Sequence, residues 1–99
     1  MSDVTKRFRD AVVRRGLDGD GKTSAARRRA AFDHADPLPL LDKVTTSAWK
    51  ITDADIAAAK ASGLGEDEIF ELVACAAIGQ ATRQLDAAVA ALDEAEKTR

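Results

Sequence analysis

The chain is poor in the residues that cross-link small proteins. Its 99 residues include one cysteine, Cys75, and one histidine, His34, so it can form no internal disulfide and offers no Cys/His cluster for a structural zinc. A domain of this size buries only about 60–65% of its unfolded surface and is marginal on its own. Association with other subunits is the remaining source of stability. We therefore expect a homo-oligomer with no metal and no cofactor.

Long apolar runs are also lacking. No stretch reaches the about 18 residues that a membrane-spanning helix needs, and the first ten residues, MSDVTKRFRD, contain no hydrophobic signal core. These two observations predict a cytoplasmic protein that has no contact with a membrane.

The chain has no excess of positive charge. Its formal net charge is −2, although the basic residues concentrate in residues 1–36 and the acidic residues in 37–99. A pI near 5.3 lacks the basic footprint of a nucleic-acid binder, so we expect no nucleic acid partner. The basic half can instead complement the acidic half of a neighbouring subunit.

Strand signals are scarce, whereas alanine is abundant, and the sequence therefore predicts an all-α fold. Breakers divide the chain into five expected helices, namely 4–15, 24–34, 40–49, a fourth between a Thr52 cap and a Gly63 stop, and a long fifth from Glu66 onward. We expect one compact helical domain over residues 1–99. Residues 23–99 form its core, and residues 1–22 form a loosely packed first helix and a glycine-rich loop.

The expected last helix changes character along its length. Between Ile69 and Gly79 it is apolar on nearly every face, so protein must surround it. Beyond Gln80 only a stripe is apolar. Because the helix can reach about 45 Å, it either breaks near Gly79 or extends onto a partner. The predicted core and interface residues, which include the single tryptophan, are Trp49, Ile69, Phe70, Leu72, Val73, Ile78, Leu85, Val89 and Leu92.

The stretch GLDGDGKT at residues 16–23 fits the phosphate-loop pattern G-x-x-x-x-G-K-[ST]. Such a loop needs a buried strand before it, whereas the preceding residues are charged and helical in pattern. Asp18 and Asp20 would also bring negative charge to an anion site. Read as a calcium loop, the same stretch places Arg27 where a bidentate Glu is required. We therefore interpret it as a glycine-rich loop between helices.

Three side chains are weak candidates for catalysis. Cys75 lies in the apolar part of the last helix, where burial would raise the pKa of its thiol and make it inert. His34 follows a helix between two aspartates, so it is either a proton-transfer group or a helix terminator. Glu71 is a second candidate for proton transfer and, together with Asp53, an expected ion-pair partner of Arg83.

One long stretch supports a family resemblance. It contains TDADIAAAKASGLGEDEIFELV, a capped helix with a Gly-Leu turn and an acidic start to an apolar helix, and then AAIGQATRQL, a small-residue run with an arginine. Through these features residues 38–92 resemble the alkylhydroperoxidase D-like, or carboxymuconolactone decarboxylase-like, superfamily. The resemblance implies an all-α fold and assembly through helices into dimers, trimers or hexamers.

The peroxidase chemistry of that superfamily relies on a Glu, a CxxC pair and a nearby His on one helix. The chain has no CxxC, so these catalytic roles do not carry over. We expect a non-peroxidatic, structural, accessory or regulatory subunit of an oligomer. The alternative is a small decarboxylase- or isomerase-like enzyme that uses His34 or Glu71 in a pocket between subunits.

Overall fold

A computed structural model of the chain describes residues 21–97 together with Arg7, Asp10 and Arg14. Residues 21–97 are mostly helical and contain no strand, as the sequence predicts. They form four α-helices and one 3-10 turn, which are α2 (Ala25–Phe32), α3 (Pro39–Thr46), η1 (Ala48–Lys50), α4 (Asp53–Ala61) and α5 (Glu66–Lys97). Most of the expected first helix, 4–15, lies outside the described residues. Of its members, Arg7, Asp10 and Arg14 are helical.

Local capping explains where the short helices begin and end. The side chain of Ser24 accepts from the N–H of Arg27 at the start of α2, and Pro39 occupies the first turn of α3. Thr52 and Asp55 form the reciprocal capping box that the sequence predicts for α4. After α4, Gly63 adopts a φ of 103°, a left-handed conformation that suits glycine and that confirms the predicted stop.

The third expected helix ends earlier than predicted. Helix α3 stops at Thr46, and Trp49 lies in the separate turn η1. Three hydroxyl side chains follow one another here, and those of Thr45 and Thr46 both donate to the carbonyl of Asp42. Side chains that compete for backbone carbonyls weaken a helix end, which accounts for the early stop.

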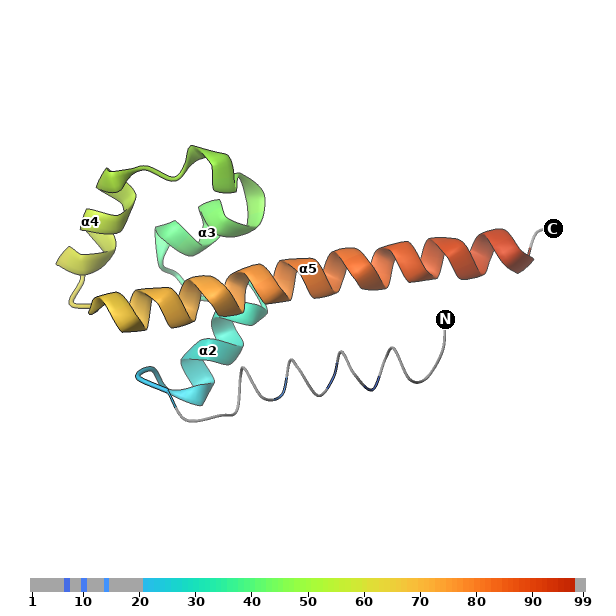
Figure 1. The fold of residues 1–99 in the computed structure, drawn as a ribbon, viewed down its shortest axis with the longest axis horizontal. Helices are drawn as coiled ribbons and strands as arrows, with labels where there is room; N and C mark the ends of the chain where they lie inside the picture. Colours follow the sequence, from blue (N-terminus) through green and yellow to red (C-terminus); the bar gives the residue numbers. More distant parts are fainter. Residues whose placement is uncertain (1–6, 8–9, 11–13, 15–20, 98–99) are drawn as a thin grey trace.

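Helix α5 is the longest element and does not break at Gly79. Its 32 residues span about 48 Å at 1.5 Å per residue. The first half packs against α2, α3 and α4, whereas the second half extends beyond these three helices (Figure 1). The expectation of a compact bundle is therefore wrong for the C-terminal half of α5, where no residue from 80 to 97 is buried.

The core lies where the three short helices meet the first half of α5. Leu72 is its central residue, with a side chain that is fully buried. The other buried apolar residues come from every helix and are Ala31, Leu38, Leu40, Leu41, Ala59, Ile69, Cys75 and Ala76. The many alanines in this list allow the helices to approach closely, because the interaxial distance depends on side-chain size at the contact.

Candidate functional site

Glu71 is held by the loop that precedes α2. Its carboxylate accepts the backbone N–H of Lys22 at 2.7 Å and that of Thr23 at 3.0 Å. The hydroxyl of Thr23 donates a third hydrogen bond at 2.9 Å. A side chain from the first half of α5 therefore binds a segment about fifty positions earlier in the chain and fixes the start of α2.

These contacts favour the ionised form of Glu71. The hydrogen bond from the N–H of Lys22 is the main cause that lowers the pKa of this carboxyl, followed by the N–H of Thr23. Burial acts in the opposite direction and raises this pKa, less strongly than either N–H group lowers it, and the hydroxyl of Thr23 and the positive charge of Arg28 add smaller lowering effects. Glu71 is therefore an ionised acceptor at neutral pH and a poor proton donor.

Arg28 of α2 completes the surroundings of this carboxylate. The residue is only 6% exposed, and its Nε is buried without a hydrogen-bond partner. A β-carbon at Gly21 would lie 2.6 Å from Glu71 Oε1 and 2.8 Å from Arg28 Nη1. The ends of these two side chains would have to shift to admit a β-carbon, and the guanidinium and the carboxylate converge on the same point of the loop.

The loop also explains the phosphate-loop pattern of the sequence. Residues 16–20 of that pattern lie outside the described residues, but Gly21, Lys22 and Thr23 end it, and α2 begins at Ala25. The backbone donors of this loop face the chain's own carboxylate. The interpretation as an interhelical loop before a helix is consistent with the described part of the pattern, in which no strand occurs.

Cys75 lies one turn after Glu71, on the side of α5 that faces the core. The residue is 5% exposed, and burial is the main cause that raises the pKa of its thiol. The charge of Glu71 also raises this pKa, while that of Arg28 lowers it. A buried thiol with a raised pKa is a poor nucleophile, as the sequence predicts.

Gly79, one further turn along α5, touches the end of α2. A β-carbon at this position would fall on the carbonyl group of Phe32, the last residue of α2. One turn later, Arg83 donates from Nη1 to the same Phe32 carbonyl oxygen at 2.6 Å and from Nη2 to Gln80 Oε1 at 3.3 Å. The expected ion pair of Arg83 with Glu71 or Asp53 is therefore wrong, because a backbone carbonyl at a helix end takes its place.

The four residues of α5 that face α2 follow a simple spacing. Glu71, Cys75, Gly79 and Arg83 are four positions apart and share one side of the helix. The sequence carries this signal, but nothing in it identifies Lys22, Thr23 and Arg28 as the groups opposite.

His34 ends α2 in a strained conformation. Its φ is 60°, in the left-handed region, and the N–H groups of His34 and Ala35 donate to the carbonyls of Ala31 and Ala30 as in a Schellman motif. Its Nε2 lies 2.9 Å from Asp42 Oδ1 and 3.1 Å from Thr45 Oγ1. The partner is thus an aspartate of α3, and within residues 21–97 no hydrogen bond joins His34 to Glu71 or Cys75.

The predicted core and interface residues differ in their exposure. Ile69 is 6% exposed and Leu72 is fully buried, and Val73 packs against this core. Ile78 and Val89 are half-buried. The other four are exposed side chains, which are Trp49 at 80%, Phe70 at 73%, Leu92 at 57% and Leu85 at 39%.

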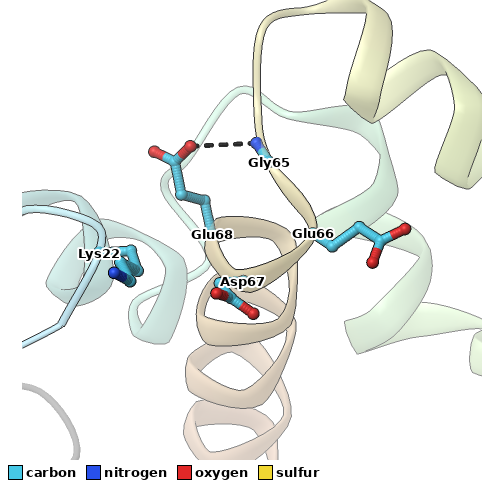
Figure 2. A pocket seen from close by; sticks show the side chains of 5 residues that line it. All are labelled: Lys22, Gly65, Glu66, Asp67 and Glu68. Atoms are coloured by element: carbon cyan, nitrogen blue, oxygen red, sulfur yellow. Dashed lines mark hydrogen bonds between the residues drawn. The ribbon is translucent and has the colours of Figure 1, made fainter.

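Open hollows lie at the start of α5. One, of about 610 Å³, is lined by Lys22 and by the turn from Gly65 to Glu68. Figure 2 shows Glu68 directed back to Gly65, whose N–H it accepts at 3.0 Å, while Glu66 points to the opposite side. There Glu66 pairs with Lys60 at 2.8 Å.

A smaller hollow beside Phe70 is more apolar. It measures about 290 Å³ and lies between α4 and α5, lined by Ile56, Lys60, Glu66, Ile69, Phe70 and Val73. Four of its six lining residues are apolar, and the other two, Lys60 and Glu66, form an ion pair with each other.

Within the described residues no three His, Cys, Asp or Glu side chains are grouped so that they could hold a metal ion. A search of the same residues finds no helix that is long and apolar enough to cross a membrane. Comparisons with protein-family models, with curated proteins and with solved structures give no match.

Proposed function

We propose that the chain is a non-peroxidatic, cytoplasmic helical protein that assembles with copies of itself and acts as a structural, accessory or regulatory subunit. One observation carries the proposal. The acidic and thiol side chains with catalytic potential, Glu71 and Cys75, are engaged in the contact between α5 and α2, while the large apolar side chains of Trp49 and Phe70 are exposed.

The distribution of apolar side chains supports a binding role. Trp49 and Phe70 expose most of their surface, and large aromatic residues are enriched at the centres of protein interfaces. The chain thus offers other proteins more than it offers a small substrate.

The resemblance of residues 38–92 to the alkylhydroperoxidase D-like superfamily agrees with this proposal. The capped helix α4, the turn at Gly63 and the acidic start of α5 are the features on which that resemblance depends. Membership of the superfamily is part of the proposal, and the missing CxxC makes the chain a member without peroxidase chemistry.

Two measurements test this proposal, an assay of peroxidase activity and a determination of the oligomer mass. Purified full-length chain is assayed for peroxide reduction with a dithiol reductant and is examined by native mass spectrometry. We expect no thiol-dependent turnover and a defined oligomer without added mass. Turnover that depends on Cys75 would overturn the non-peroxidatic role, and a monomer at all concentrations would overturn the assembly.

The alternative is a decarboxylase- or isomerase-like enzyme. The contact of 2.9 Å between His34 and Asp42 favours it, because a carboxylate can orient an imidazole for proton transfer. The lowered pKa of Glu71 speaks against that residue as the acid. If the chain has such an activity, His34→Ala should abolish it; activity that survives the change removes His34 as the candidate.

A further inference from the structure

One face of α5 carries an apolar stripe along most of its length. We define the α5 stripe as Phe70, Ala77, Ala81, Leu85, Ala88 and Leu92, all of which are exposed. At 100° per residue these six positions fall within about 80° of one another. By the same rotation the stripe lies on the side of α5 opposite to Gly79, which touches α2. Helix α5 itself runs from the folded body into its extended half (Figure 1).

The α5 stripe is uncharged. Between Phe70 and Leu92 the charged residues are Glu71, Arg83 and Asp86, and none of them belongs to it. Glu71 and Arg83 are already engaged with the loop and the end of α2. An uncharged apolar face can pair with a copy of itself without like-charge repulsion, as a two-fold interface requires.

The length of the α5 stripe indicates which element can cover it. The stripe spans 22 steps from Phe70 to Leu92, or about 33 Å. Helices α2, α3 and α4 have 8, 8 and 9 residues, about 12–14 Å each, and cannot cover it. Among the described elements only α5 itself offers an apolar face of equal length.

We propose that two copies of the chain pair along the α5 stripe with their α5 helices antiparallel and a two-fold axis near Ala81. This register places Leu85 of one copy opposite Ala77 of the other, so that a large side chain meets a small one. The inference rests on the proposed assembly and deepens it, because it names the partner and the surface.

The hollow between α4 and α5 extends the contact. In the same register Leu92 of one copy lies opposite Phe70 of the other, next to the apolar hollow of about 290 Å³. A leucine side chain seated there would cover the exposed Phe70 ring and add α4 to the interface. Because two helices touch only along a narrow strip, the buried area is at the low end for specific complexes, and we expect a dimer that dissociates on dilution.

The charges at the two ends of α5 give the pair a distinct salt response. In the antiparallel pair Glu66 and Asp67 of one copy lie close to Glu96 of the other, because these three positions share the side of α5 that carries the stripe. Salt screens this repulsion and should strengthen the dimer. Binding to a basic partner protein through the same acidic ends would weaken as salt rises.

Sedimentation equilibrium of the full chain tests the pairing with two matched variants. Ala81→Glu places a charge at the axis, whereas Ala87→Glu places the same charge on another side of α5, and both alanines are exposed. We expect Ala81→Glu to raise the dimer dissociation constant at least about tenfold and Ala87→Glu to leave it nearly unchanged. Equal effects of the two variants, with helicity preserved in both, would overturn the proposed surface.

Spin-label distances test the orientation. A nitroxide on Ala91→Cys should report a separation near 30 Å in the antiparallel dimer, since position 91 then lies opposite position 71, about 20 residues away along the helix axis. The buried Cys75 leaves the introduced thiol as the reactive one. A separation near 10 Å indicates a parallel pair and contradicts the proposal.

The outcomes separate this inference from the proposed function. An oligomer that is insensitive to Ala81→Glu keeps the assembly and removes the α5 stripe as its surface. A dimer that responds as expected but turns over peroxide keeps the surface and removes the non-peroxidatic role. A chain that stays at 10.5 kDa at every concentration and salt overturns both.

Discussion

Glu71 and Arg83 hold opposite ends of α2 from a single side of α5. Glu71 accepts the N–H groups of Lys22 and Thr23 just before α2, and Arg83 donates to the carbonyl of Phe32 where α2 ends. The negative side chain lies near the positive end of the α2 dipole and the positive side chain near its negative end. Because α2 has only 8 residues, too few to be stable alone, we infer that α5 determines whether it forms.

The carboxylate of Glu71 should therefore contribute to the thermal stability of the fold, although the residue is only half-buried. Glu71→Gln keeps the shape but removes the charge, and its amide NH2 group, which cannot accept a hydrogen bond, replaces one of the two oxygens that the three donors use. We expect the thermal midpoint to fall by a few degrees. Glu94→Gln, the same change on an exposed part of α5, is the control and should leave the midpoint nearly unchanged. Thermal unfolding followed by circular dichroism measures both, and equal midpoints would show that the loop contact stabilises nothing.

The same carboxylate predicts how stability changes with pH. The pKa of Glu71 in the folded chain is lowered from its ordinary 4.5, first by the N–H of Lys22. A group with a lowered folded pKa stabilises the fold above its unfolded pKa, and that stability is lost as pH falls through the folded value. We expect the urea midpoint of the wild type to fall as the pH is lowered from about 6 to about 3, the range in which carboxyls ordinarily titrate. The midpoint of Glu71→Gln should fall less over the same range.

Two other carboxyls, Asp55 and Glu66, also have lowered pKa values, and their contribution to the acid response is still present in Glu71→Gln. The Lys43 ammonium bonded to Asp55, with distances of 2.9 and 3.0 Å, is the main cause that lowers the pKa of Asp55. Lys60 acts likewise on Glu66. A pH response that is identical in wild type and Glu71→Gln would show that carboxyls other than Glu71 determine the acid sensitivity.

Gly79 allows α2 and α5 to touch. Glycine inside a helix is usually less stable than alanine by about 1 kcal/mol, but a β-carbon here would fall on the Phe32 carbonyl. We therefore expect Gly79→Ala to destabilise the fold by about 1–3 kcal/mol, the range for overpacking. Chemical denaturation measures the free energy of unfolding. Gly65→Ala, where the new carbon would lie 3.5 Å from Glu68 Oε1 in ordinary contact, is the control and should change little.

The sequence predicts elements better than it predicts contacts. The Thr52 cap and the Gly63 stop are local signals, and the structure contains both. The end of α3 depends on hydroxyls that compete for the Asp42 carbonyl, which periodicity does not report. The carboxylate, glycine and arginine that contact α2 are evenly spaced in α5, but their partners lie 47–51 positions away, and single-sequence patterns contain no such distance.

A second limit of prediction from the sequence is that it does not show which apolar residues are exposed. Apolar character alone cannot distinguish Leu72, which is fully buried, from Phe70, which is 73% exposed two positions earlier. The difference depends on which side of α5 the short helices cover. Periodicity places the two residues about 200° apart around the helix, but it does not say which of the two sides faces the core.

Cys75 should be chemically silent in the folded chain. It is buried, and burial raises the pKa of its thiol, so the thiolate that reacts with disulfide reagents is scarce. We expect an aromatic disulfide reagent at neutral pH to react with the native protein far more slowly than with the unfolded protein, in which one thiol per chain titrates at once. Similar rates in both states would mean that the thiol is accessible, and would reopen the case for thiol chemistry.

His34 should respond to substitution in opposite directions depending on the replacement. Its φ of 60° costs a residue with a side chain about 1–2 kcal/mol, and glycine avoids this cost. His34→Gly also loses the contacts with Asp42 and Thr45, which are exposed and therefore weak. We expect His34→Gly to stabilise the chain by roughly 0.5–1 kcal/mol and His34→Ala, which keeps the strained φ but loses the contacts, to destabilise it. Urea denaturation of the two variants at pH 7 separates the effect of the lost contacts from that of the backbone strain, because both variants lack the imidazole and only His34→Gly relieves the strain. If both variants destabilise the chain equally, the side-chain contacts rather than the backbone conformation determine the role of His34 at the end of α2.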